Sequence, residues 1–411
     1  MKKNYPWVVV GLLVFVALLN YLDRQMLSTM RESMSLSFEE LQGADGARMF
    51  GWLMSAFLWV YALVSPFAGA IADKLNRKWL IIGSLAVWSA VTCLMGYSQN
   101  FSQLLVLRGL MGISEALYIP SALSLIADWH KDGNRSLAIG MHTTGLYLGS
   151  ALGGYGALVA SEMSWQFTFH TLGYVGIAYA FVLVLLLKEK RVTEPVVALK
   201  EPTATPTKKE ATMAGVSAVL SIGAFWVILF MFAIPSLPGW ATKNWLPELF
   251  SESLGMDITV GGPYATIALA MSSFAGAFIG GVISDKWVKR NVRGRVFTSA
   301  IGLGLTLPGL VLLGFCHGLA AVVGAVILFG LGFGIFDTNN MPILCQFVAS
   351  KYRATGYGIM NMVGVLFGAV ATAVMGSLPS LALGFACMAG AVAIAICLQL
   401  TCLHPKVDNK E

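Results

Sequence analysis

Long apolar runs, separated by short polar connectors, are the feature that most limits how this chain can fold. A run of about 18 or more apolar residues is long enough to cross the hydrocarbon core of a bilayer as an α-helix. Hydrophobic residues make up 57% of the 411 residues and charged residues only 12%, whereas a soluble domain has about 25% charged residues. The sequence therefore predicts an all-α, multi-pass membrane protein with twelve transmembrane helices. We expect them near residues 6–30, 48–72, 79–98, 103–128, 137–160, 166–187, 214–250, 259–283, 296–317, 319–347, 355–377 and 381–402.

Three short sequence patterns occur twice along the chain, in the same order and at nearly the same interval. They are Gly69–Lys78 with Gly281–Arg290, Gly112–Pro120 with Gly334–Pro342, and Asn134–Gly140 with Tyr352–Gly358. A stretch rich in Lys, Glu, Thr and Pro separates the two copies and is predicted to be a flexible linker. We therefore expect an N-terminal six-helix half at 1–187, a linker at 188–213 and a C-terminal six-helix half at 214–411. Repeated halves of this kind typically hold a binding site at their interface.

The distribution of basic residues predicts how the helices are oriented. Most Lys and Arg residues lie in the two tails, in the linker and in connectors on the same side of the bundle, and the exceptions are Arg24, Arg31, Arg48, Arg108 and Lys243. The positive-inside rule places such connectors in the cytoplasm, so we expect both termini and the linker to be cytoplasmic. The net charge of +6 is thereby explained by topology, and no nucleic-acid partner is expected.

Charged residues deep inside the apolar runs are the candidates for chemistry, because each costs at least about 2.5 kcal/mol in hydrocarbon. The acids are Asp23, Glu115 and Asp337, and the neighbouring cations are Arg24 and Arg108. A carboxylate beside an arginine in apolar surroundings is suited to load and release a proton, and a guanidinium presents a planar fork to a carboxylate ligand. The alternative for Asp23 and Glu115 is a fixed structural ion pair with Arg24 or Arg108, and for Asp337 a structural polar contact.

Several motifs resemble those of known families. Gly69-x-x-x-Asp73-x-x-x-Arg77-Lys78 resembles the loop signature of the major facilitator superfamily. Within that superfamily, N-Y-L-D-R (Asn20–Arg24), R-x-x-x-G-x-x-E-A (Arg108–Ala116) and N-W-L-P (Asn244–Pro247) resemble the anion:cation symporters, which include galactonate and hexuronate transporters and sialin. The spinster-like lysolipid transporters share the first of these motifs and a similar arginine and glutamate on the fourth helix. The resemblance covers the whole chain and implies the twelve-helix fold of the superfamily.

The resemblance implies roles for the charged residues. Asp23 and Glu115 match the acids that bind coupling protons, Arg24 matches an arginine that binds the substrate anion, and Arg108 matches one that links the two sites. Arg108 is accordingly a candidate for both proton coupling and substrate binding. The resemblance also implies that the coupling ion is H⁺, and neither another cofactor nor a metal ion is expected. The six cysteines form no C-x-x-C pair, so the sequence predicts neither a disulfide framework nor a metal site.

Other polar residues in the apolar runs are candidates for substrate contact, with helix packing as the alternative. Tyr21 and Tyr61 match family positions that hydrogen-bond the substrate, and the remaining candidates are His142, Tyr147, Asn244, Asn339, Asn340 and Asn361. A conformational latch at the cytoplasmic helix ends is implied by the superfamily's loop signature and its repeat. Its expected members are Gly69, Asp73, Arg77 and Asp285.

The sequence and its resemblances together predict a secondary active transporter, most simply a proton-coupled symporter of an organic anion such as an aldonate or uronate. It is expected to act as a monomer in a bacterial inner membrane, in contact with lipid. One alternative is a spinster-like carrier of lysolipids or other amphiphiles. Another is a non-transporting membrane receptor or scaffold. An enzyme is not expected, because no nucleophile–base pair or metal-ligand cluster stands out among the helices.

Overall fold

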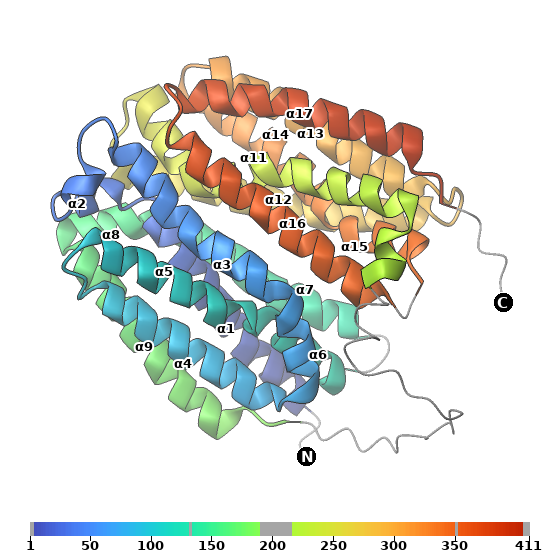
Figure 1. The fold of residues 1–411 in the computed structure, drawn as a ribbon, viewed down its shortest axis with the longest axis horizontal. Helices are drawn as coiled ribbons and strands as arrows, with labels where there is room; N and C mark the ends of the chain where they lie inside the picture. Colours follow the sequence, from blue (N-terminus) through green and yellow to red (C-terminus); the bar gives the residue numbers. More distant parts are fainter. Residues whose placement is uncertain (1–3, 131–133, 190–215, 350–351, 406–411) are drawn as a thin grey trace.

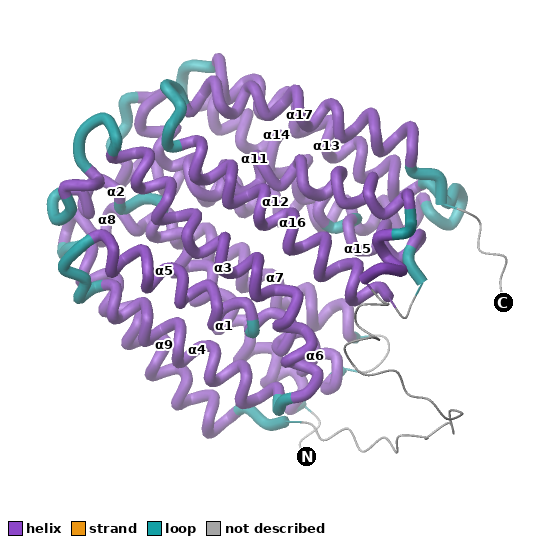
Figure 2. The backbone as a smooth tube through the Cα atoms, in the orientation of Figure 1, coloured by secondary structure: helices purple, strands orange, loops and turns teal. Residues whose placement is uncertain are grey.

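The computed structural model describes residues 4–130, 134–189, 216–349 and 352–405, without the side chains at 69, 70, 72–74, 136 and 354. All regular secondary structure in these ranges is helical, and the helices lie side by side in one bundle (Figure 1, Figure 2). The long helices are α1 (Tyr5–Leu27), α3 (Gly46–Lys74), α4 (Arg77–Met95), α9 (Trp165–Leu186), α11 (Gly223–Leu254), α12 (Ile258–Trp287), α13 (Gly294–Phe315), α16 (Arg353–Met375) and α17 (Leu381–Cys402). Other crossings combine two shorter helices, namely α5 (Phe101–Ala116) with α6 (Tyr118–Trp129), α7 (Arg135–Leu152) with α8 (Gly156–Glu162), and α14 (Leu319–Asp337) with α15 (Asn340–Phe347).

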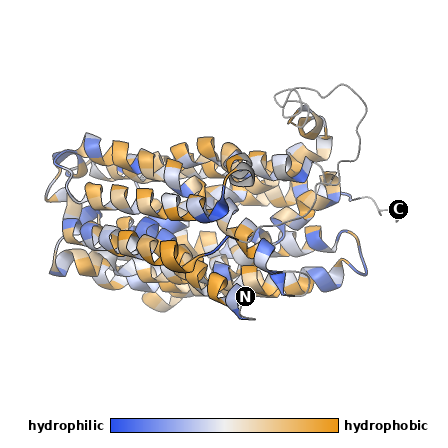
Figure 3. Ribbon diagram, turned by 90° about the horizontal axis from the view of Figure 1, so that it is seen from below, coloured by the Kyte–Doolittle hydropathy of each residue, from blue (hydrophilic) through white to orange (hydrophobic). Residues whose placement is uncertain are grey.

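The helices have the length and surface of membrane spans. Eleven segments of the described chain are long and apolar enough to cross a membrane. The predicted run at 137–160 is not among them, and it folds as α7 and α8 separated by the 3-10 turn η2 (Gly153–Tyr155). Large apolar side chains such as Leu185 and Phe278 remain more than 70% exposed, and Figure 3 shows hydrophobic residues along the length of the helices. The chain is therefore an all-α, multi-pass membrane protein, as predicted.

The helices pack as two groups that follow the order of the chain. In the first group α1 packs on α7, α3 on α5 and α4 on α9, and in the second α12 and α13 pack on α14 and α11 on α16. The two groups meet where α3 lies against α16 and where α7 lies against α12. Most of the predicted linker falls outside the described residues, so the boundaries predicted for the halves stay predictions. Helix α2 (Arg31–Ser35) follows α1 at the end of the bundle opposite the two chain ends, and we call this the α2 end (Figure 1).

Helix α11 is continuous although it contains three prolines. Its three internal prolines, Pro235, Pro238 and Pro247, predict a break in this part of the sequence. That prediction is wrong, because the helix runs without interruption from Gly223 to Leu254. A proline removes the helical partner of the carbonyl group four residues earlier, and membrane helices tolerate this where neighbouring groups satisfy that carbonyl. Such a neighbour is present for the carbonyl of Lys243, four residues before Pro247. It accepts a hydrogen bond of 2.6 Å from Nε2 of Gln25 on α1.

Two helix breaks coincide with the acids of the repeated pattern, Glu115 and Asp337. Helix α5 ends at Ala116, directly after Glu115, and α6 begins at Tyr118. The break has a local cause, because the ring of Pro120 clashes with the carbonyl of the residue four positions earlier. Asp337, which matches Glu115 in the second copy, is the last residue of α14. The repeat therefore places one acid at a mid-bundle break in each group of helices.

Helix α7 packs on α1 at very short range because two glycines face α1. A Cβ added at Gly145 would collide with the carbonyl oxygen of Val14, and one added at Gly149 with that of Leu18. Glycines four residues apart allow membrane helices to approach closely. These two positions therefore fix the distance between α7, which borders the second group of helices, and α1, which carries Arg24.

We predict that Gly149→Ala destabilises the protein by about 1–3 kcal/mol, because the added methyl group forces α7 away from α1. Gly140→Ala on the same helix is the matched control, since a Cβ there meets nothing within 4 Å. The measurement is unfolding of the purified protein in detergent. Equal stabilities of the two variants would contradict the prediction.

Candidate functional site

An ion pair between α1 and α5 lies at the centre of the first group of helices. The Nε of Arg24 donates to Oε2 of Glu115 at 2.5 Å, and a second guanidinium nitrogen lies at the same distance from that oxygen. Asn20 donates to the same Oε2 at 2.8 Å. Glu115 is fully buried and the side chain of Arg24 is 11% exposed. Arg24 Nε and Asn20 Nδ2 thus both donate to one carboxylate oxygen. Among the described residues, neither Nη2 of Arg24 nor Oε1 of Glu115 has a hydrogen-bond partner.

The second arginine of the cluster is buried without an acidic partner. Arg108 is 3% exposed, and its polar contact is to the sulfur of Met111 at 3.4 Å. No carboxylate of the described chain lies within 4.0 Å of its guanidinium. Both arginines instead lie over the ring of Phe57, Arg24 at 4.5 Å and Arg108 at 5.2 Å from its centroid. Phe57 therefore links the two cations through cation–π contacts.

Asp23 faces a different helix from its neighbour Arg24. Its Oδ2 accepts from the Thr92 hydroxyl of α4 at 3.4 Å, and its Oδ1 has no hydrogen-bond partner in the described chain. The side chain is 3% exposed. Asp23 of α1 and Glu115 of α5 are thus both buried carboxylates. Among the described residues, one oxygen of each has no hydrogen-bond donor.

A cavity of about 350 Å³ lies between the two groups of helices. Its polar lining includes Tyr21 and Thr143 of the first group and, from the second group, Ser236, Lys243, Asp337, Asn340, Tyr357 and Asn361. An adjoining hollow of about 140 Å³ shares Tyr21, Lys243 and Asp337 and adds Tyr147. Asp337 is exposed although it lies in mid-bundle, because it faces this space. The cavity extends to Tyr357, which lies one turn from the beginning of α16 at the end of the bundle that holds the chain ends.

The structure brings some of the predicted substrate residues to the cavity. Tyr21, Asn340 and Asn361 line the cavity, and Tyr147 lines the adjoining hollow. Arg24 lies directly behind Tyr21, since its guanidinium is 5.1 Å from the Tyr21 ring and 5.1 Å from the ring of Tyr61. The tyrosine rings therefore separate the Arg24 ion pair from the cavity.

Other predicted residues lie away from the cavity. His142 is 1% exposed and pairs with the Tyr118 hydroxyl at 2.9 Å. Asn339 is fully buried and donates to the carbonyl of Ile335 at 2.8 Å. Asn244 donates to the Thr372 hydroxyl of α16 at 2.9 Å. These three side chains have partners within their own group of helices, and their proposed contact with substrate stays a prediction.

Lys243 lines the cavity, although it was not among the substrate-binding residues predicted from the sequence. It lines both hollows, and its ammonium lies 4.7 Å from the centroid of the Trp240 ring. A signal was present in the sequence, because Lys243 is a lysine inside an apolar run and outside the basic connectors. A lysine in hydrocarbon is energetically unfavourable, as are Arg24 and Arg108, so its position in the sequence already indicated a functional site.

Several contacts join the two groups of helices at the α2 end, in addition to the hydrogen bond of 3.3 Å that Asn361 of α16 donates to the Ser65 hydroxyl of α3. Arg31 forms an ion pair with Glu248 of α11, next to the hydrogen bond from Gln25 to the Lys243 carbonyl. At the same end, a Cβ on Gly51 of α3 would lie 3.0 Å from a carbonyl oxygen of α16, so the two backbones touch. The bundle is therefore closed at the α2 end, on the far side of the cavity from Tyr357.

Two of the predicted latch residues, Arg77 and Asp285, form ion pairs inside their own group of helices. Arg77 at the start of α4 pairs with Asp128 of α6, and Asp285 pairs with Arg295 of α13 at 3.3 Å. The surroundings of Gly69 and the side chain of Asp73 lie outside the described part of the structure. The role of these positions as a latch stays a prediction.

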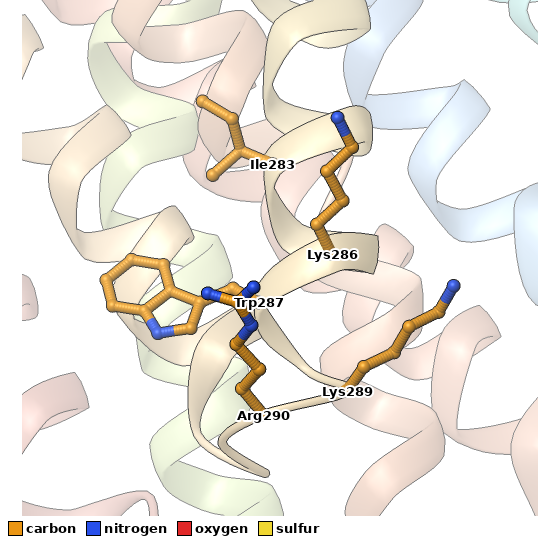
Figure 4. Close-up of a pocket in the computed structure, with 5 residues that line it drawn as sticks. All are labelled: Ile283, Lys286, Trp287, Lys289 and Arg290. Atoms are coloured by element: carbon orange, nitrogen blue, oxygen red, sulfur yellow. The ribbon is translucent and has the colours of Figure 1, made fainter.

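A separate hollow lies at the end of α12. It has a volume of about 580 Å³, and Figure 4 shows Ile283, Lys286, Trp287, Lys289 and Arg290 around it. It contains no residue of the acid and arginine cluster, so it is separate from the central site. Within the described residues, no three His, Cys, Asp or Glu side chains form a group that could hold a metal ion.

We predict strong energetic coupling between Arg24 and Glu115. Glu115→Ala leaves the Arg24 charge buried without a partner and is expected to cost about 3–5 kcal/mol, whereas the same change in an Arg24→Ala background costs much less. A double-mutant cycle in detergent should therefore give an interaction energy of at least about 1.5 kcal/mol. The exposed pair Asp45 and Arg48, 3.2 Å apart, is the control and should give less than about 1 kcal/mol. Equal values for the two pairs would contradict the prediction.

Comparisons with known proteins identify the family of this chain. Residues 13–372 match the model of the Major Facilitator Superfamily. The probable sulfoacetate transporter SauU of Cupriavidus necator is 26% identical over 90% of this chain and 86% of its own. The probable galactarate/D-glucarate transporter GarP of Escherichia coli is 25% identical over 91% of this chain and 88% of its own.

The solved structure of a bacterial homologue of the human lysosomal transporter Spinster, inward-facing and occupied, has the same fold. Its TM-score is 0.74, at 18% identity and over 97% of each chain. The matched family model covers most of the sequence, and the fold agrees with it. The chain therefore belongs to the Major Facilitator Superfamily and is a transporter rather than an enzyme.

Proposed function

We propose that this chain is a proton-coupled symporter of a small organic anion, in particular a sugar acid such as an aldonate or uronate. The names of its relatives support an anionic substrate, because SauU and GarP are described as transporters of sulfoacetate and of galactarate and D-glucarate. The positive-inside pattern supports a cytoplasmic location for both termini. The protein then lies in a bacterial inner membrane with its α2 end outside the cell.

The observation that carries this proposal is the ion pair of Arg24 with Glu115, in which only the Oε2 atom of Glu115 accepts hydrogen bonds from described residues. While Glu115 is ionised, its Oε2 holds the Arg24 fork at 2.5 Å. A proton on Glu115 removes the charge that attracts Arg24, and the guanidinium then needs another anion in these apolar surroundings. The adjoining cavity supplies one when substrate enters past Tyr21. Proton binding and anion binding thus become mutually dependent.

Asp23 and Arg108 extend the same logic to a second acid and a second cation. Each is buried, and each has polar atoms without hydrogen-bond partners in the described chain, Oδ1 in Asp23 and Nε in Arg108. Phe57 contacts both Arg108 and Arg24. A movement of Arg24 toward substrate therefore changes the surroundings of Arg108. In this way Arg108 would link the proton site to the substrate site.

Alternating access fits the distribution of contacts. The α2 end is closed by the pair of Arg31 with Glu248 and by the hydrogen bond from Gln25 to Lys243. The cavity reaches toward the chain ends, so this arrangement corresponds to a state closed toward the outside of the cell. In the opposite state these contacts separate, and the helices rock about the α3–α16 and α7–α12 seams.

The spinster-like alternative predicts a site that is apolar on one side and accepts a lysolipid. The charged and amide groups that line the cavity, Lys243, Asp337, Asn340 and Asn361, favour a small polar anion instead. A receptor or scaffold needs no acid in mid-membrane, and the buried pair of Arg24 with Glu115 argues against that class.

Uptake into proteoliposomes tests the proposal, with aldonates, uronates, sialic acid and lysophospholipids as candidate substrates. Glu115→Gln should lose accumulation driven by a pH gradient, because glutamine resembles the protonated acid and cannot release a proton. Exchange of preloaded substrate should persist in this variant, since exchange needs no net proton movement. Glu32→Gln, at an exposed acid of α2, is the matched control and should behave as wild type.

Two outcomes count against the proposal. If Glu115→Gln still concentrates substrate down a pH gradient, Glu115 does not carry the coupling proton. If a lysophospholipid is taken up in preference to every sugar acid, the substrate class is the alternative one.

A further inference from the structure

The central region of the bundle contains a second pair of opposite charges in addition to Arg24 and Glu115. Lys243 and Asp337 belong to different helices of the second group, and both line the cavity and its adjoining hollow. Tyr21, which lies between Arg24 and the cavity, lines the same two spaces as this pair. Lys243 therefore borders the space in which substrate would bind, and Arg24 lies 5.1 Å from the centroid of the Tyr21 ring that borders the same space.

Lys243 is held in place by a contact with α1. Its carbonyl oxygen lacks a helical partner because Pro247 has no N–H group, and Nε2 of Gln25 donates to that oxygen at 2.6 Å. Gln25 directly follows Arg24 in the sequence. Because of Pro247, a hydrogen bond therefore joins the two groups of helices. It holds α11 at Lys243 against α1 at Gln25, the residue after Arg24.

The ammonium of Lys243 is available to a ligand. No carboxylate of the described chain lies within 4.0 Å of it, and its neighbour at 4.7 Å is the ring of Trp240. Asp337 attracts Lys243 electrostatically but receives its hydrogen bond from Asn340 at 3.2 Å. A structural ion pair would join the two charges directly, whereas here both face a cavity with room between them.

We propose that Lys243 is a second anion subsite and that the preferred substrate is a dianion, an organic acid with an acidic group at each end. Arg24 takes one acidic group and Lys243 the other, and Asp337 is the counter-ion of Lys243 in the empty protein. This inference rests on the proposed function and specifies its substrate class. The dianion displaces Glu115 and Asp337 from their cations, and each displaced carboxylate takes one proton. The dianion and two protons then cross the membrane without net charge.

Paired ligands that differ by one acidic group test this inference on the purified full-length protein. Galactarate and galactonate differ only at one terminal carbon, and sulfoacetate is compared with methanesulfonate. Calorimetric titration of wild type should show that at least one diacid binds about tenfold or more tightly than its monoacid partner. A hydrogen bond to a charged group has this order of effect on affinity.

Variants assign the preference to Lys243. Lys243→Gln should weaken diacid binding roughly tenfold to hundredfold and change monoacid binding little, whereas Lys243→Arg should keep the preference. Asp337→Asn should tighten diacid binding, because it removes the competing carboxylate. Lys289→Gln, in the separate hollow at the end of α12, is the control for loss of a positive charge and should behave as wild type.

The outcomes separate this inference from the proposed function. The inference is wrong if wild type binds neither diacid better than its monoacid, or if Lys243→Gln weakens both members of a pair equally. Proton-driven uptake of a monoacid would then leave the proposed function intact. Conversely, a diacid preference that depends on Lys243 supports the second anion subsite even if a pH gradient drives no uptake. The absence of uptake driven by a pH gradient would refute proton coupling and leave the subsite intact.

Discussion

The need to neutralise buried charge inside an apolar bundle governs the centre of this structure. Glu115 lies where α5 ends, and Pro120 causes that ending. The break leaves the carboxylate facing α1, where Arg24 and Asn20 donate to a single oxygen. Breaking a buried pair of this kind is strongly unfavourable unless another charge or a proton takes its place. Coupling between protons and anions can arise from this exchange of partners alone.

The same constraint acts on the backbone. Proline removes hydrogen-bond donors that a membrane cannot replace, so the freed carbonyl groups need partners from the protein. In α11 the carbonyl of Lys243 obtains its partner from Gln25, across the boundary between the two groups of helices. A local defect in one helix thereby becomes a contact that closes the α2 end, together with the pair of Arg31 and Glu248. In the proposed alternating-access mechanism, both contacts separate when that end opens.

Much of the fold follows from the sequence, because hydrophobic length and internal repetition are local properties of the chain. The repeat also predicted that Asp337 would occupy a position equivalent to Glu115, and both lie at helix breaks. The continuity of α11 could not be predicted, since it depends on partners such as Gln25 that are remote in sequence. The choice of Arg24 rather than Arg108 as the partner of Glu115 is likewise a property of how helices α1 and α5 pack. Lys243 was visible in the sequence, but its orientation toward the cavity was not.

Proton uptake on ligand binding tests the central claim most directly. The purified protein is mixed with saturating sugar acid in weakly buffered solution, and the change in pH is compared with that of Glu115→Gln. If Arg24 exchanges Glu115 for the substrate, wild type takes up at least one proton for each anion bound and the variant takes up fewer. Anion binding by wild type without proton uptake, at any pH where Glu115 is ionised beforehand, would contradict the account.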